Sequence, residues 1–205
     1  MKNLLKILPI KDSRLQHKVL DKVNFPLTQQ TENQIDLLID TLRYDQGVYK
    51  NHSIALAAPQ AGITKRIIVM GNFLHHKNPL KQIEIIINPE IITYSNETDI
   101  QEEGCLSIPR YLAMVKRPTQ IKVNYFNYQG YQIIKEMYGI QARIFQHEYD
   151  HLEGQNMLTK AIEIKENPLW KPFVQKLEKN NKLDILKKDP LYEELNTQKM
   201  SQLNK

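Results

Sequence analysis

Apolar residues recur at helical spacing in three parts of the chain, and each recurrence predicts a helix. The first set is Ile35, Leu38, Ile39 and Leu42. Thr28 or Thr31 can cap the start of this helix, and Gly47 can end it. A second helix is predicted from Ile140 to Leu152, between two glycines.

A third helix is predicted near the end of the chain, where four apolar residues lie at positions i, i+3, i+4 and i+7. They are Trp170, Phe173, Val174 and Leu177. Their shared face predicts an amphipathic helix that docks on the core. Residues 181–205 are rich in Lys, Asn and Gln and weakly apolar, so we expect a polar, loosely held tail. Residues 1–180 are then expected to form a single domain.

Apolar runs between these helices predict strands. RIIVM (residues 66–70) and IEIIIN (residues 83–88) are short and rich in isoleucine, as buried strands are. Residues 119–139 hold two further runs on either side of NYQG (residues 127–130), which predicts antiparallel strands joined by a turn. Few helices together with antiparallel strands predict the α+β fold class.

Composition narrows the classes of protein that fit this pattern. The single cysteine among 205 residues excludes an internal disulfide framework. The opening MKNLLKILPI lacks the apolar core of a secretory signal, and no later stretch approaches transmembrane length. We therefore expect a cytoplasmic protein with no membrane partner. The net charge of +5 is spread along the chain among acidic residues, so no direct nucleic-acid site is evident.

The strongest chemical pattern is FQHEYDHLEG, residues 145–154, which contains His147-Glu148-x-x-His151. Residues four apart on a helix face the same way, with Cβ atoms roughly 5–6 Å apart, so both imidazoles can bind one metal ion. Glu148 points beside that ion and can handle a proton. Ile144 continues the same face, which predicts that the histidines point inward. The alternative is a pair of hydrogen-bonded core histidines.

Two histidines need a third ligand, and Cys105 is the best candidate. No histidine follows His151, and the later acidic residues lie in lysine-mixed segments. A thiolate is a strong ligand for a soft or borderline divalent metal, and Gly104 lets the backbone approach closely. Taken alone, a single cysteine is more often a buried structural thiol. Beside a two-histidine helix that lacks a third ligand, we favour the ligand interpretation.

These residues lie in segments that resemble a known family. ALAAPQAG (residues 55–62), EEGCLSIP (102–109) and QHEYDHLEG (146–154) resemble the three signature motifs of peptide deformylase, in the same order. PIKDSRL, near the start, also looks like that family's first segment. The resemblance covers roughly residues 5 to 160. It implies an α+β fold in which antiparallel sheets pack around a central metal-binding helix that carries the HExxH motif.

The resemblance also implies an activity and a cofactor. The expected activity is removal of the formyl group from N-formylmethionyl peptides as translation proceeds, with release of formate and a transient visit to the ribosome. Members of the family typically use Fe(II), and nickel, cobalt or zinc can replace it. The metal ligands that carry over are Cys105, His147 and His151.

Roles for further residues follow from the same resemblance. The side-chain amide of Gln60 and the backbone N–H of Leu106 would stabilise negative charge on the formyl oxygen. Glu148 would take a proton from water and pass it to the leaving amine. From the residues themselves, Asp150 and Glu103 are candidates to fix the ligand helix, with Arg117 as a partner for one of them. The alternative for Asp150 is an ordinary surface position.

Substrate binding is expected at five residues: Ile54, Gly104, Ile140, Arg143 and Ile144. The isoleucines at 140 and 144 would line an apolar pocket one and two turns before the ligands. Ile54 and Gly104 would offer backbone hydrogen bonds to an extended peptide. Arg143, at the edge of the same helix face, is expected at the pocket mouth.

The first motif departs from the family pattern, because Ser53 and Ala55 stand where two glycines are usual. Added Cβ atoms there could narrow the cleft. We favour a small shift of the loop with normal activity over a changed substrate preference or a weakly active paralogue. Another metal-dependent amidase or peptidase and a non-catalytic binding module remain alternatives.

Overall fold

The computed structural model of the protein describes residues 4–44, 53–71, 80 and 82–180. Its α-helices are α1 (Gln29–Tyr44), α2 (Gly139–Leu152) and α3 (Trp170–Lys179). Its strands are β1 (Ala55–Ala57), β2 (Ile67–Gly71), β3 (Ile83–Tyr94), β4 (Thr98–Cys105), β5 (Ile108–Pro118), β6 (Gln120–Phe126), β7 (Gln132–Tyr138) and β8 (Ala161–Glu166). Short 3₁₀ helices are η1 (Ser13–Leu15), η2 (Ala58–Ala61) and η4 (Met157–Lys160).

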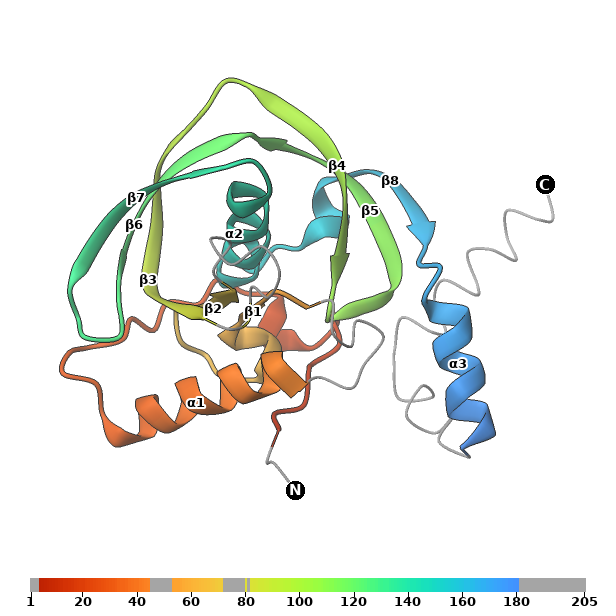
Figure 1. Ribbon diagram of the computed structural model, residues 1–205, viewed down its shortest axis with the longest axis horizontal. Helices are drawn as coiled ribbons and strands as arrows, with labels where there is room; N and C mark the ends of the chain where they lie inside the picture. The colour runs from red at the N-terminus through yellow and green to blue at the C-terminus, as the bar shows by residue number, and fades with distance from the viewer. Residues whose placement is uncertain (1–3, 45–52, 72–79, 81, 181–205) are drawn as a thin grey trace.

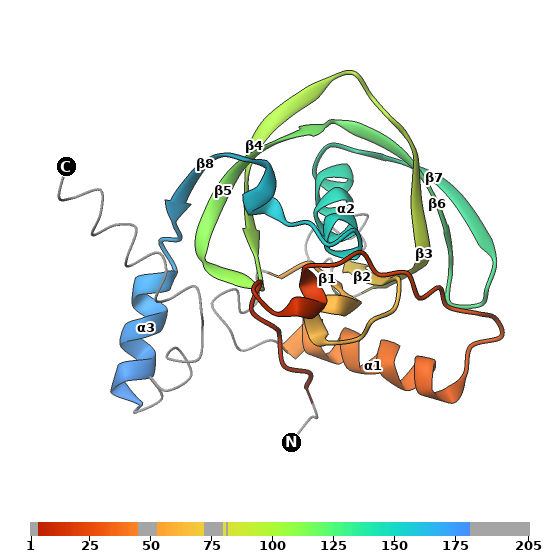
Figure 2. The same ribbon diagram turned by 180° about the vertical axis from the view of Figure 1, so that it is seen from behind.

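The strands form two antiparallel sheets around one helix. A five-stranded sheet has the order β1-β2-β3-β6-β7, and a three-stranded sheet has the order β4-β5-β8. Helix α2 packs against strands of both sheets. Figures 1 and 2 show α2 enclosed between the sheets, with α1 on the far side of β1 and β2. The predicted α+β class with antiparallel sheets is confirmed.

Strand β2 shows why this arrangement forms. Ile68 and Met70 point into the core beside α2, whereas Ile67 and Val69 point into the core beside α1. Successive side chains of a strand face opposite sides, so a strand covered by a helix on each side must be apolar throughout. All of β2 is buried, which confirms the prediction from RIIVM.

Capping and turn residues correctly predicted where several helices and strands begin or end. Thr28, rather than Thr31, caps α1, because its hydroxyl oxygen accepts a hydrogen bond from the Thr31 N–H. The turn between β6 and β7 lies at the predicted NYQG, where the Asn127 side chain accepts from two backbone N–H groups. Gly130 in this turn has φ +83°, which favours glycine. Gly47 and residues 181–205 lie outside the described residues.

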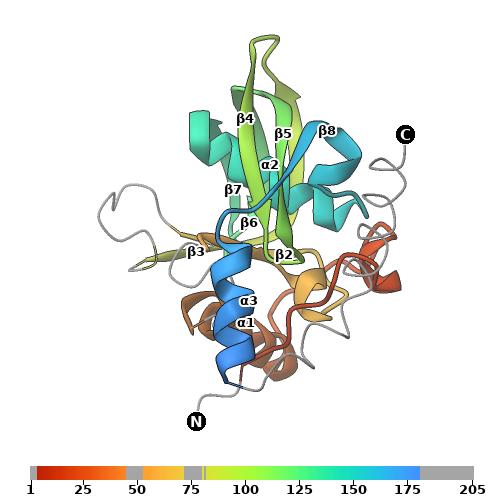
Figure 3. The same cartoon turned by 90° about the vertical axis from the view of Figure 1, so that its right-hand side faces the viewer.

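The prediction that α3 docks on the core is wrong. Of its four apolar residues only Trp170 is buried, and the other three are half-exposed. Figures 1 and 3 show α3 outside the space that the two sheets enclose. Asn167 fixes the start of this segment by bonding to the carbonyls of Pro109 and Arg110, so the helix begins at the sheet edge and leads away from the core. None of the described helices is long and apolar enough to cross a bilayer.

Candidate active site

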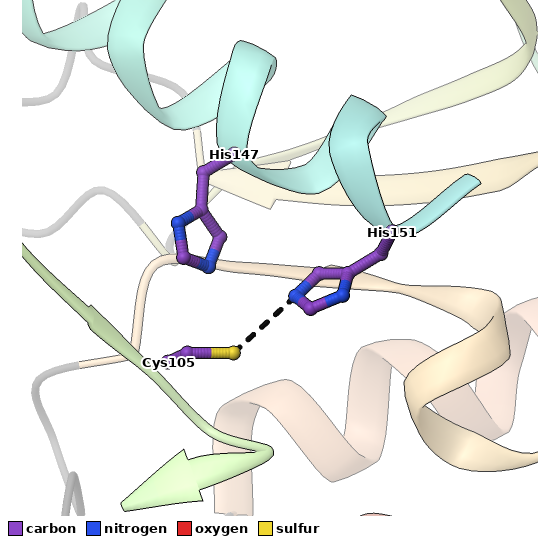
Figure 4. Close-up of side chains that lie close together, drawn as sticks. All are labelled: Cys105, His147 and His151. Atoms are coloured by element: carbon purple, nitrogen blue, oxygen red, sulfur yellow. Dashed lines mark hydrogen bonds between the residues drawn. The ribbon is translucent and has the colours of Figure 1, made fainter. Parts of the chain in front are cut away.

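The side chains of Cys105, His147 and His151 converge between β4 and α2 (Figure 4). One ligand atom from each residue lies within 4.8 Å of the other two. Sγ of Cys105 lies 3.3 Å from Nε2 of His151. All three side chains are buried. The structure therefore brings the three predicted metal ligands together from segments far apart in the sequence.

Two backbone features produce this convergence. His147 and His151 lie one turn apart on α2, so their rings project from one face with centroids 5.3 Å apart. On β4, the register with β5 shifts between Gly104 and Cys105. Such an irregularity bends a strand and redirects its side chains. The strand therefore ends with its thiol facing the two rings.

The donor set fits one soft or borderline divalent metal ion. Thiolate and imidazole ligands suit zinc, iron, nickel or cobalt better than magnesium or calcium. Nδ1 of His147 lies 2.9 Å from Oε2 of Glu103, which fixes the ring and leaves Nε2 as its ligand atom. Burial, with the charge of His147, lowers the pKa of His151 well below its ordinary value. A lowered pKa favours the neutral imidazole, which is the form in which a histidine binds a metal.

The alternative of two satisfied core histidines accounts for less of this geometry. Burial lowers the pKa of His147, but hydrogen bonds to Cys105 and Glu103 outweigh it and raise that pKa well above its ordinary value, and this feature the alternative does explain. Nδ1 of His151 is buried without a hydrogen-bond partner among the described residues. Hydrogen bonding alone would not require both rings to face one thiol.

Glu148 lies beside the cluster and is 5% exposed. Burial raises the pKa of its carboxyl to about 7, although the charge of His147 acts to lower it. A carboxyl that titrates near neutrality can both accept and release a proton. A cation bound by the cluster would favour its ionised form. The position and the environment of Glu148 suit a general base.

Gln60 is held with its amide nitrogen toward the cluster. Its Oε1 accepts a hydrogen bond from the Ala57 N–H at 3.0 Å, which orients the side chain. Its Nε2 then lies 3.5 Å from Sγ of Cys105 and 3.3 Å from the hydroxyl of Ser107. Leu106 follows the cysteine and lines the same cavity. The role of Ser107 as a partner of Gln60 was not foreseen, although it lies within the GCLS motif.

A cavity of about 170 Å³ opens beside the cluster. It is lined by all five residues predicted to bind substrate, namely Ile54, Gly104, Ile140, Arg143 and Ile144, and also by Gln60, Leu106 and Glu148. Ser53 and Ala55 line it as well. Ala55 shares the α2-facing side of the sheet with Ala57 and Met70, so its methyl group belongs to the cavity wall.

Arg143 differs from the expectation of a residue at the pocket mouth. Its side chain is 3% exposed, and its guanidinium binds Glu103 and Asp99 on β4. Asp99 could not be predicted as a partner, because the pairing depends on how β4 lies against α2. Arg143 is therefore a buried part of the cavity wall.

A second buried arginine connects the predicted carboxylates. Arg117 donates to Glu103 from Nε at 2.6 Å and from Nη2 at 2.8 Å, and Nη1 donates to Asp150 at 2.8 Å. Asp150 also pairs with Lys160 at 2.5 Å. Burial raises the pKa of Glu103, but Arg117 and His147 outweigh it and hold that pKa well below its usual range. Arg117 was expected to pair with one of these two carboxylates, and it pairs with both.

Comparisons with known proteins identify the family of this chain. The model of the family described as Polypeptide deformylase matches residues 5–167. A peptide deformylase of Phenylobacterium zucineum is 40% identical over 138 residues, which cover 67% of this chain and 79% of the relative. The crystal structure of peptide deformylase from Thermotoga maritima aligns with TM-score 0.67 and 31% identity, over 79% of this chain and 100% of the other.

A third comparison includes a bound peptide. The Met-Ala-Ser bound structure of a class I type b peptide deformylase from Acinetobacter baumannii aligns with TM-score 0.67 and 28% identity, over 78% of this chain and 99% of the other. Family and cluster together indicate a single metal ion. The chain belongs to the polypeptide deformylase family, the hydrolases that remove the N-formyl group from nascent peptides.

Proposed function

We propose that this chain removes the formyl group of N-formylmethionyl peptides in the cavity beside Cys105, His147 and His151, with one Fe(II) held by these three residues. The convergence of a thiol and two imidazoles within 4.8 Å carries the proposal. Nickel, cobalt or zinc suits the same donors. A divalent ion there would supply a Lewis acid and would lower the pKa of water.

The protein's own groups divide the remaining work of hydrolysis. Glu148 takes up the proton that the attacking water loses and delivers it to the leaving amine, which otherwise departs poorly. The Nε2 of Gln60 and the N–H of Leu106 donate to the formyl oxygen as negative charge builds on it. The orientation of the Gln60 side chain by Ala57 supports this role, because the donor is held in place before substrate arrives.

The peptide is proposed to lie as an added strand between β1 and β4. Both are edge strands of their sheets, and residues of both line the cavity beside the cluster. The carbonyl of Ile54 accepts from the Gly71 N–H, so this carbonyl is already paired within the five-stranded sheet. Gly104 on β4 is exposed and offers backbone groups from the other side.

The methionine side chain then enters the apolar part of the cavity at Ile140 and Ile144. The Acinetobacter baumannii relative is bound to Met-Ala-Ser, a peptide of the kind that deformylation produces. We propose that Ser53 and Ala55 leave this reaction intact, because the cavity persists with both side chains in its wall. A weakly active paralogue is the alternative.

The setting of the reaction follows from its substrate. Formylated chains emerge from the ribosome, so we place the enzyme in the cytoplasm with transient access to ribosomes. Residues 1–180 are proposed to form the catalytic domain and residues 181–205 a polar tail. The mixture of basic and acidic residues in that tail does not favour strong electrostatic anchoring.

Formate release from formyl-Met-Ala-Ser by the Fe(II) or Ni(II) protein tests the proposed reaction. We expect turnover by the wild type and a loss of roughly 100-fold or more in Glu148→Ala, because general acid–base catalysis typically contributes that much. Unformylated Met-Ala-Ser serves as the control and should remain uncleaved. Equal formate release by the two proteins would contradict the role of Glu148. Cleavage of the unformylated peptide would favour a peptidase instead.

A further inference from the structure

Strand β4 and helix α2 meet through three side-chain contacts that follow the same order along both elements. The residues of β4 that contact α2 in this way are Asp99, Glu103 and Cys105. The residues one turn apart on α2 are Arg143, His147 and His151. Asp99 pairs with Arg143, Glu103 with His147, and Cys105 with His151. The two elements are thus in register where the three candidate ligands lie.

Arg143 makes the first contact and also reaches the second. Its Nη2 lies 2.5 Å from Oδ1 of Asp99 and donates to the Asp99 carbonyl at 3.1 Å. Its Nη1 donates to Oε1 of Glu103 at 2.6 Å and to the carbonyl of Val115 at 3.0 Å. A single buried guanidinium on α2 therefore binds two carboxylates that lie four residues apart on β4.

Glu103 is bound from two directions. Arg117, on the neighbouring strand β5, holds it within the three-stranded sheet. Arg143 and His147 hold it from α2. Without Arg143, His147 would be the one residue of α2 among those described that still binds Glu103. The carboxylate that orients a candidate metal ligand therefore depends on Arg143 for its position relative to the helix.

We propose that Arg143 is a positioning residue, which fixes β4 against α2 and so sets the separation of Cys105 from His147 and His151. The proposal rests on the proposed function, because it requires the cluster to bind a metal. A displacement of β4 along α2 would move the thiol relative to both imidazoles. The planar fork of an arginine, bound to two carboxylates and two carbonyls, resists that displacement in a way that a lysine cannot.

Metal affinity measures this role directly. Residues that orient metal ligands typically contribute roughly 10–100-fold to metal affinity, so Arg143→Met should weaken Zn(II) binding by about that factor. Arg143→Lys keeps the positive charge but lacks the planar fork of the guanidinium, so it should recover only part of the lost Zn(II) affinity. The Co(II) protein should change its visible spectrum in Arg143→Met, because that spectrum reports the geometry of the ligands.

The experiment titrates apo full-length protein with Zn(II) against a chelator of known affinity, and records Co(II) spectra of the same proteins. Arg110→Met is the matched control, since Arg110 lies on β5, its side chain is 13% exposed, and it pairs with Glu166 on β8. This control should bind Zn(II) like the wild type. Circular dichroism identifies the folded proteins.

Asp99→Asn is the second variant, and it decides the question if Arg143→Met does not fold. Asp99 is 34% exposed, so its substitution should leave the fold intact and still weaken Zn(II) binding several-fold. Unchanged Zn(II) affinity and Co(II) spectrum in a folded variant would overturn the positioning role. Failure of the wild type itself to bind Zn(II) or Co(II) would instead overturn the proposed metal site.

Discussion

At the residue scale, Glu103 links the metal cluster to the charged interior. It accepts hydrogen bonds from Arg117 and Arg143 and orients His147, and all four side chains are buried. Buried charges are tolerated only when they are paired and hydrogen-bonded, and here each carboxylate oxygen has partners. The result of this pairing is that one imidazole, that of His147, is held in a fixed orientation.

Cys105→Ser tests the third ligand at the same scale. A serine hydroxyl stays protonated near neutral pH and is a poor ligand for these metals. We therefore expect metal affinity to fall at least ~100-fold, which is more than the loss of a residue that only orients a ligand usually causes. Deformylase activity should fall with it. Equilibrium dialysis with Zn(II) measures the affinity. Full metal occupancy with unchanged activity would refute the assignment of Cys105.

At the element scale, α2 and α3 are both amphipathic, yet only α2 is part of the core. Phe145 on α2 is fully buried against the five-stranded sheet, whereas Phe173 on α3 is half-exposed. The helical period predicts which face of a helix is apolar, but it does not predict which element will cover that face. This is why the expected docking of α3 was wrong.

Substitution of these two phenylalanines compares how much each helix contributes to the stability of the protein. Phe145→Ala removes a fully buried ring and should lower the free energy of unfolding by about 3–5 kcal/mol. Phe173→Ala should lower it by less, about 1 kcal/mol, because its ring is only partly buried and lies outside the core clusters. Urea denaturation of both variants measures the difference. Equal losses would indicate that α3 contributes to the core after all.

At the scale of the whole molecule, the sequence predicted the three candidate metal ligands better than it predicted the buried ion pairs that surround them. The two histidines were foreseen because helical spacing is local, and Cys105 because few other residues could complete the ligand set. Asp99 was missed because its pairing with Arg143 depends on the long-range packing of β4 on α2. Arg143 was placed at the pocket mouth for the same reason, since its position on the helix does not reveal its partners.

The two edge strands that face the cluster also belong to this scale. β1 ends one sheet and β4 ends the other, and residues of both strands line the cavity beside the cluster. Helix α2 lies between the sheets (Figure 1), and Cys105 and His147 line the cavity beside it. The proposed positions of substrate and metal therefore depend on the same packing.

Metal analysis of anaerobically purified protein, followed by the formate assay on the same sample, tests the central claim most directly. The account predicts close to one iron ion per chain and formate release from formyl-Met-Ala-Ser that is lost together with the iron on chelation. Restoring Fe(II) should restore the activity. Formate release that persists in metal-free protein, or iron-loaded protein that releases no formate, would contradict the account.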